Sequence, residues 1–485
     1  MDKKKRLITM VVTLLVLTIG VTFAYFMART GEGKQAGTTI TTGTVDDLKF
    51  NVSKENLSLN INQFNFASGA GNLTDNVTAT ASLKANSKKK TAKYNYYVYF
   101  QIESNDYVYT TTDKKPEIVL SITGPNGEIT SVDGLTYVSA TNADGTVVKG
   151  FDITESKPSF IKIADSYEIS SSSSTNYTNQ EWTFTVTFIN LDTNQVGNQN
   201  KNLTGKVLIQ QEKILSLAEY VVSQYTGTQG ENNIYYHDAN LTNGAGDNSY
   251  RFAGASSAVN NYVCFGLRDA SCPADNLYRI IGVFGDRVKL IKSTSVGNKA
   301  WDSNRSNTWS TSSLNSYLNT EFINIFDAGA KEKIDTTTWK VGGNASDNIA
   351  KQPAKTVYQN EIVNPVTTNS TDSKTEYSAK IGLMYASDYG FAAAPSAWTT
   401  TLYDYDGAAI KNVNWMYLGS FEWTISRFAD RSDNAFNVDE SGFVAGSSNY
   451  SNVTAVRGVR PVFYLSSSVN YASGSGSATD PIVVN

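Results

Sequence analysis

Hydrophobic and polar residues alternate along the first half of the chain with the period of a β-strand. Four such runs lie at residues 47–52, 57–61, 94–100 and 182–188. Turn sequences such as Pro125-Asn126-Gly127 separate them, and almost no helical spacing interrupts the pattern. Period-two alternation is typical of strands with one buried face, so we expect a β-sandwich over residues 37–210.

The spacing of apolar residues changes after residue 210. Residues 215–222 show the first helical pattern, which predicts a helix and linker over residues 211–232. Short strands then alternate with helical segments. The Gly285-Asp286 pair predicts a tight hairpin turn, and an amphipathic helix follows Trp309 and extends to Ile325. We therefore expect an α+β domain over residues 233–485, in a chain that is mostly β with some helix.

The N-terminus predicts export across a membrane. A basic cluster at Lys3–Arg6 precedes an uncharged run from Leu7 to Ala28. This run is long enough to cross the hydrocarbon core, and the basic cluster would stay on the cytoplasmic side. Residues 1–30 are therefore expected to be a signal peptide cleaved after Ala24, with Ala28 as a second candidate, or, if uncut, a hydrophobic helix that anchors the chain in the membrane. Either way, the rest is predicted to be extracellular, at the cell surface.

Composition excludes several classes of function. The net charge of -4 and the low isoelectric point, about 5.4, give no field that attracts nucleic acid. The single histidine, His237, removes most histidine-based metal sites and catalytic triads, and we expect no cofactor. Cys264 and Cys272 have seven residues between them. In an exported protein this spacing favours a disulfide, with free buried thiols as the alternative.

The first 50 residues resemble a family of exported surface proteins. The string Thr22-Phe23-Ala24-Tyr25-Phe26 and the threonine-rich segment 38–46 are similar to the start of TasA/camelysin-type proteins. The resemblance implies a jelly-roll-like first domain and assembly into fibres or surface layers. Some camelysins are described as proteases, but the His-Glu-x-x-His motif is absent here, so that activity is not transferred.

Residues 212–485 resemble a group of uncharacterised surface domains from Firmicutes. The shared strings lie at residues 278–284, 339–343, 379–385 and 460–465. The layout is more weakly similar to the C-type-lectin-like fold of formylglycine-generating enzymes and bacterial adhesins. Those enzymes use a closely spaced cysteine pair late in the domain. Cys264 and Cys272 lie early and further apart, so the resemblance does not carry that catalysis to this chain.

Six of the seven tryptophans fall in the second domain, and tryptophan stacks well on sugar rings. The candidates for ligand binding are Trp301, Trp309, Trp339, Trp398 and Trp415. The alternative is that all of them are core residues, as we expect for Trp423.

Three other candidates are weaker. Asp404-Tyr405-Asp406-Gly407 and Asp433-Asn434 are faintly similar to calcium loops, but neither matches a full loop pattern. Arg457 and Arg460 are expected to pair with buried carboxylates. His237 beside Asp238 is expected to be structural.

These observations predict a non-enzymatic bacterial surface protein that binds or adheres through its C-terminal domain. The expected partner is a glycan, a component of the cell envelope or a protein, with the membrane as a further partner if the N-terminal helix is uncut. No catalytic residue is predicted. The alternatives are a structural subunit of a fibre or matrix, and a hydrolase or sulfatase-modifying type of enzyme.

Overall fold

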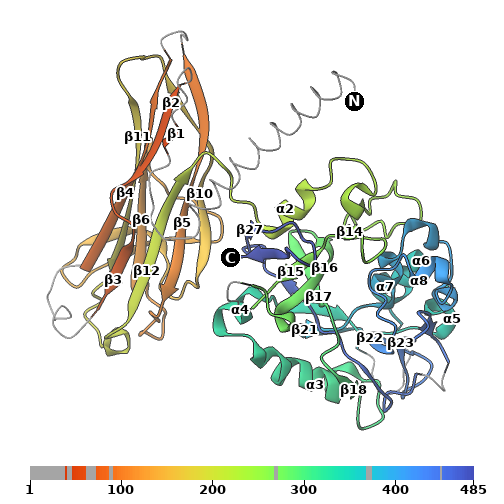
Figure 1. The fold of residues 1–485 in the computed structure, drawn as a ribbon. Coiled ribbons are helices and arrows are strands. Elements are labelled where there is room, and N and C mark those ends of the chain that lie inside the picture. The colour runs from red at the N-terminus through yellow and green to blue at the C-terminus, as the bar shows by residue number, and fades with distance from the viewer. Residues whose placement is uncertain are drawn as a thin grey trace, which may run out of the picture. The chain divides into compact units, whose positions relative to one another are not determined.

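The computed structural model describes residues 39–40, 46–61, 73–86, 91–266, 271–366, 374–447 and 451–485. The predicted N-terminal helix, Ala24 and most of the TasA-like start lie outside these residues. Among the residues that are described, no helix is long and apolar enough to cross a membrane. The chain divides into two compact units, Met1–Lys213 and Ile214–Asn485 (Figure 1).

The N-terminal unit is a sandwich of two antiparallel sheets. The larger sheet has the order β1 (Thr39–Ile40), β2 (Asp47–Val52), β4 (Leu73–Lys84), β11 (Thr178–Phe188), β6 (Ile118–Gly124), β9 (Val147–Asp152) and β8 (Thr136–Thr141), with β7 (Gly127–Glu128) paired to β6. The smaller sheet has the order β10 (Ser159–Ser171), β5 (Ala92–Asn105), β12 (Asn202–Gln210) and β3 (Leu57–Asn60).

Alternating side chains from both sheets form the core of this unit. Burial alternates at every position along β3, as the pattern of residues 57–61 predicts. Trp182 of β11 is fully buried, and its indole N–H donates to the Tyr96 hydroxyl of the facing sheet at 2.9 Å. Gly124 lies against the same indole ring, where a Cβ atom would come within 2.8 Å of it. The predicted β-sandwich is therefore confirmed.

The C-terminal unit is α+β, with a nine-stranded and a five-stranded sheet. The larger has the order β21 (Ile381–Gly382), β26 (Val462–Leu465), β17 (Arg287–Lys292), β16 (Leu277–Phe284), β15 (Tyr262–Cys264), β28 (Ile482–Val484) and β27 (Tyr471–Ser473), extended from β16 by β14 (Tyr250–Phe252) and β13 (Ile234–Tyr236). The smaller has the order β18 (Asn298–Ala300), β25 (Val456–Gly458), β22 (Glu422–Arg427), β23 (Ala435–Val438) and β24 (Val444–Ala445). A two-stranded ribbon pairs β19 (Thr337–Lys340) with β20 (Glu376–Ala379).

Short helices connect and cover these strands. They are α2 (Leu217–Ser223), α3 (Ser313–Thr320), α4 (Ala328–Lys333), α5 (Ser346–Ile349), α6 (Ala354–Tyr358), α7 (Ala386–Ala392) and α8 (Ala408–Lys411), and a π-helical turn, Gln359–Val363, follows α6. The helix predicted after Trp309 is α3, but it ends at Thr320, and Ile325 is 57% exposed instead of buried. The chain as a whole is mostly β with some helix, as predicted.

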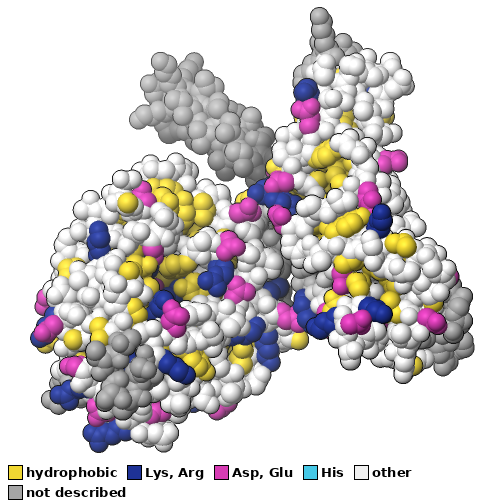
Figure 2. Space-filling model, turned by 180° about the vertical axis from the view of Figure 1, so that it is seen from behind, with side chains coloured by type: hydrophobic (Ala, Val, Ile, Leu, Met, Phe, Trp, Pro, Cys, Tyr) yellow, Lys and Arg dark blue, Asp and Glu magenta, His cyan; other side chains and the backbone are white. Residues whose placement is uncertain are grey.

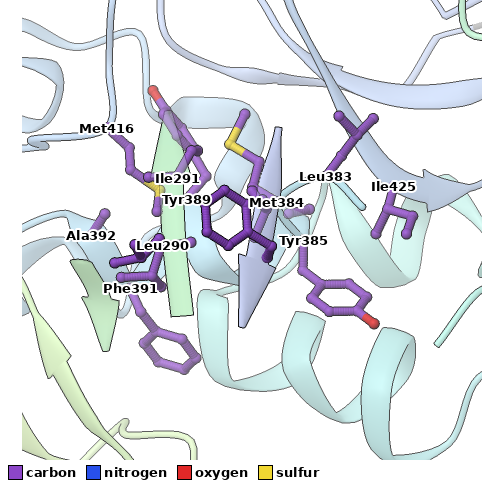
Figure 3. Packing of buried hydrophobic residues seen from close by; sticks show 14 of the residues in the cluster. Leu290, Ile291, Leu383, Met384, Tyr385, Tyr389, Phe391, Ala392, Met416 and Ile425 are labelled. Carbon is purple, nitrogen blue, oxygen red and sulfur yellow. The ribbon is translucent and has the colours of Figure 1, made fainter. Parts of the chain in front are cut away.

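The hairpin β16–β17 forms the centre of the larger sheet. Its turn is the predicted Gly285-Asp286 pair, and Gly285 has a φ of 66°, a conformation that glycine adopts without steric cost. Leu290 and Ile291 of β17 pack with Tyr389 and Phe391 of α7 in the core (Figure 3). This arrangement places α7 against β17, and the polar cluster described below lies between the same two elements.

Helix α2 belongs to the C-terminal unit instead of serving as a linker. Ser216 caps it in a capping box with Glu219. The Leu217 N–H donates to the Val469 carbonyl at 2.7 Å, and Tyr220 stacks on Tyr471 with ring centroids 3.6 Å apart. The beginning and the end of this unit are therefore held together.

Candidate functional site

The five tryptophans predicted to bind a ligand are all core residues. Trp301, Trp309, Trp339, Trp398 and Trp415 are each at most 1% exposed. Four of the five indole N–H groups donate to backbone carbonyls, as buried indoles require. None presents a ring face to solvent, so the predicted stacking platform is corrected to a structural role. Their large apolar area is the physical reason for burying them.

The predicted disulfide is confirmed. Cys264, at the end of β15, is bonded to Cys272 with a Cα–Cα distance of 5.7 Å. Cys264 is buried, so the bond fixes the segment that carries Cys272 to the end of β15, at the edge of the core. In this bonded state neither thiol is free to act as a nucleophile or as a metal ligand.

His237 is a buried, neutral core residue. The Ala245 N–H donates to its Nδ1 atom at 3.0 Å, and the edge-on ring of Phe391 lies 4.9 Å away. Burial and the nearby Arg251 charge hold the pKa of His237 well below its usual 6.5. Asp238 accepts bonds from the N–H groups of Asn240 and Leu241, not from His237. The two residues therefore do not form a base and its orienting partner.

The acidic loops and one of the late arginines, Arg460, are also accounted for. Asp404 accepts a bond from Thr401, and Asp433 forms an ion pair with Arg305. The buried Arg460 pairs with Glu422, as predicted. Across the described parts of the chain, no group of three or more His, Cys, Asp or Glu side chains is arranged to hold a metal ion.

A buried polar cluster connects α7 to the central sheet. The Lys289 Nζ atom lies 2.5 Å from Asp388 Oδ2, and both side chains are 1% exposed. Arg251 of β14 approaches Asp388 Oδ1 at 3.5 Å and forms a tighter pair, 2.6 Å, with Asp247. The Tyr385 N–H also donates to Asp388 Oδ2 at 2.9 Å, so the same carboxyl caps α7. The cluster holds two cations and two acids, and its formal charges cancel.

Aromatic rings enclose the Lys289 amine. Its Nζ atom lies 4.7 Å from the ring centroid of Tyr385, 5.5 Å from those of Phe284 and Tyr464, and 5.8 Å from that of Trp339. These ring faces partly replace the water that burial removes, since each attracts a cation. The amine and the carboxyl of Asp388 are therefore held in contact in an environment that excludes bulk water.

A third carboxyl lies next to this cluster. Glu361, in the π-helical turn, accepts a bond from the Ser387 N–H at 2.7 Å and another from the Ser426 hydroxyl. Burial raises the pKa of Glu361 to about 7, although the bonds from Ser387 and Ser426 lower it; the charge of Asp388 raises it further. Its side chain can therefore both donate and accept a proton near neutral pH.

Three half-buried tyrosines form a separate array near the surface. The rings of Tyr236 (β13) and Tyr250 (β14) stack with centroids 4.5 Å apart, and Tyr225, just after α2, meets Tyr250 edge-on at 5.5 Å. The Tyr236 hydroxyl donates to the exposed amide of Asn248, and Gln229 makes two bonds to the Tyr236 backbone. We call these three rings the tyrosine array.

The sequence contained weak signals for both groups. Lys289 interrupts an apolar strand between Val288 and Leu290, and a charged residue in such a position is buried with a partner. The tyrosine array is marked by Tyr236 and Tyr250, which lie directly opposite each other in the β13–β14 pairing. That pairing depends on the register of two three-residue strands, which periodicity does not predict.

Comparisons with known proteins give one match. Residues 285–467 match the model of a domain of unknown function, DUF6273. No curated protein and no solved structure matches the chain. The matched segment contains Lys289, Glu361 and Asp388, whereas the tyrosine array precedes it.

Proposed function

We propose that this chain is an exported surface protein that binds a glycan of the cell envelope or of a host through its C-terminal unit. The observation that carries the proposal is the tyrosine array. Three rings are fixed against one another at 4.5 to 6.2 Å, remain half-exposed, and have amide side chains beside them.

The array has the properties of a carbohydrate-binding surface. Aromatic faces bury the apolar side of a pyranose ring, and neighbouring amides bond to its hydroxyl groups. Tyrosines held by mutual stacking lose little conformational entropy when a ligand binds. Figure 2 shows that hydrophobic side chains reach the surface in small patches set among polar atoms. Such a mixed apolar and polar surface suits an amphipathic ligand such as a sugar.

Binding of glycans to the purified chain tests the proposal. We expect the wild-type chain to retain a subset of envelope or host glycans on an array, and Tyr236→Ala and Tyr250→Ala to weaken that binding about tenfold each, a typical effect of removing an aromatic anchor. Tyr403→Ala is the matched control, because Tyr403 is 50% exposed and lies outside the array. Equal binding by all three variants, or retention of no glycan by the wild type, would contradict the proposal.

One feature of the N-terminal unit favours assembly as a second candidate function. Strand β8 lies at the end of the larger sheet, where its described pairing is with β9 alone, and its sequence is rich in residues that favour strands. An edge of this kind can accept a strand from another molecule. Electron microscopy at rising protein concentration distinguishes the two states: fibres would support assembly, and a monomer at all concentrations would exclude it.

A further inference from the structure

We propose that Lys289 and Asp388 join through an amide bond between their side chains, so that the C-terminal unit carries an internal covalent cross-link. The cross-link would connect the central strand β17 to the first turn of α7. This inference does not depend on the proposed ligand, because none of the tyrosine array takes part.

Contact and burial are the first requirements, and both are met. The amine nitrogen lies 2.5 Å from a carboxyl oxygen, and each side chain is 1% exposed. In water the high water concentration favours hydrolysis, the reverse of this condensation. A site that excludes bulk water weakens that opposition. Preorganised contact also removes the entropic cost of bringing the two groups together.

The charges of the cluster allow the pair to become neutral. Arg251 is already balanced by Asp247 at 2.6 Å, so one proton transferred from Lys289 to Asp388 leaves no uncompensated charge. The neutral amine is the nucleophile that the reaction needs.

The reaction then balances without any further reagent. The Lys289 nitrogen attacks Cγ of the protonated Asp388 carboxyl and forms the C–N bond. Arg251 and the Tyr385 N–H donate to the two carboxyl oxygens, where negative charge develops. The C–O bond breaks, and the oxygen leaves as water with two protons that began on the lysine ammonium. No atom is oxidised or reduced.

Glu361 serves as a positioning residue. It accepts a bond from the backbone N–H of Ser387, the neighbour of Asp388. Ionising both of two neighbouring buried carboxyls costs more free energy than ionising one, and the charge of Asp388 accordingly raises the pKa of Glu361. With a pKa of about 7, Glu361 therefore holds an exchangeable proton beside the Lys289–Asp388 pair near neutral pH. We expect Glu361→Gln to change the pH dependence of cross-link formation in freshly synthesised chain, which a purely structural role would leave unaltered.

Peptide mapping of the purified, reduced chain tests the cross-link. Trypsin does not cut after an acylated lysine, so the expected product is a branched peptide joining residues 288–292 to residues 381–411, one water molecule lighter than its two parts. Only linear peptides, with cleavage after Lys289, would overturn the proposal. This test uses the wild-type chain and needs no variant to fold.

Two variants localise the bond. Lys289→Arg keeps the positive charge but lacks a nucleophilic amine, and we expect the branched peptide to disappear. Lys292→Arg is the matched control, since Lys292 is buried in the same strand and its amine donates to the backbone carbonyls of Ala274 and Leu277. A branched peptide that persists in Lys289→Arg, or disappears in Lys292→Arg, would contradict the assignment.

Discussion

The two units bury a glutamate in opposite ways. In the N-terminal unit Glu117 is fully buried and accepts four bonds from neutral donors: the N–H and hydroxyl of Thr110 and the amides of Gln195 and Asn198. In the C-terminal unit Glu422 is equally buried but faces the Arg460 guanidinium, with one hydrogen bond of 2.7 Å and a second N–O contact of 2.6 Å.

The difference shows what each unit requires of a buried charge. Glu117 gathers two loops around one acceptor, so its energy is spread over several modest hydrogen bonds. Glu422 depends on one partner, and removing either member leaves the other charged and without water. The first arrangement holds loops in place, whereas the second fixes the register of strand β22 against the segment that carries Arg460.

The largest expected effect comes from breaking the ion pair. Glu422→Gln leaves Arg460 buried without a counter-charge, and we expect the C-terminal unit to lose about 3–5 kcal/mol of its free energy of unfolding. Urea unfolding followed by tryptophan fluorescence measures this, because six of the seven tryptophans lie in that unit. A loss below about 1 kcal/mol would mean that the pair adds little.

An exposed pair provides the control for this measurement. Arg305 and Asp433 form an ion pair of 3.1 Å, but the arginine side chain is 68% exposed. Surface pairs of this kind contribute about 0–1 kcal/mol. Asp433→Asn should therefore leave the unfolding midpoint almost unchanged.

The next effect concerns Glu361, a buried glutamate that forms no ion pair with any of the described residues. Its pKa is about 7 in the folded unit, against 4.5 for an ordinary glutamate. Between these values the folded unit keeps a proton that the unfolded chain has released, so stability falls as pH rises from 4.5 to 7. The total change is about 3 kcal/mol, and above pH 7 this contribution is constant.

Comparison of two unfolding series against pH isolates this contribution. His237 acts in the opposite direction, because its pKa is lowered and the folded unit loses stability as pH falls below 6.5. The difference between wild type and Glu361→Gln removes the His237 contribution, which both share. We expect that difference to vary with pH between 4.5 and 7; a difference that is constant with pH would contradict the raised pKa.

Most of the fold followed from the spacing of apolar residues, but the arrangement of polar groups did not. The alternation along residues 182–188 predicted β11, and the Gly285-Asp286 pair predicted the β16–β17 hairpin. These signals are local, so one sequence is enough to detect them. Helix α3 ended earlier than predicted, because the apolar spacing continues through Phe322 into a 3-10 turn.

The buried cluster around Lys289 and Asp388 could not be predicted because its members come from distant segments. Lys289 and Asp388 are 99 residues apart, and their contact depends on how α7 packs against the sheet. The prediction that tryptophans bind a ligand was wrong for a related reason. Their number is compatible with either a binding surface or a core. Only packing distinguishes the two, and all six in this unit are buried.

The smallest effect among the three buried glutamates is expected for the hydrogen-bonded one, Glu117. Glu117→Gln has nearly the same shape, but its amide nitrogen would face donors in place of an acceptor. We expect the free energy of unfolding of the N-terminal unit to fall by about 2 kcal/mol, because two donors are left without an acceptor while the other two keep theirs. Hydrogen exchange should become faster first in residues 106–117 and 190–200, the two loops that Glu117 joins. Slower opening of these loops, or a loss as large as that of Glu422→Gln, would show that the two buried glutamates are not held in different ways.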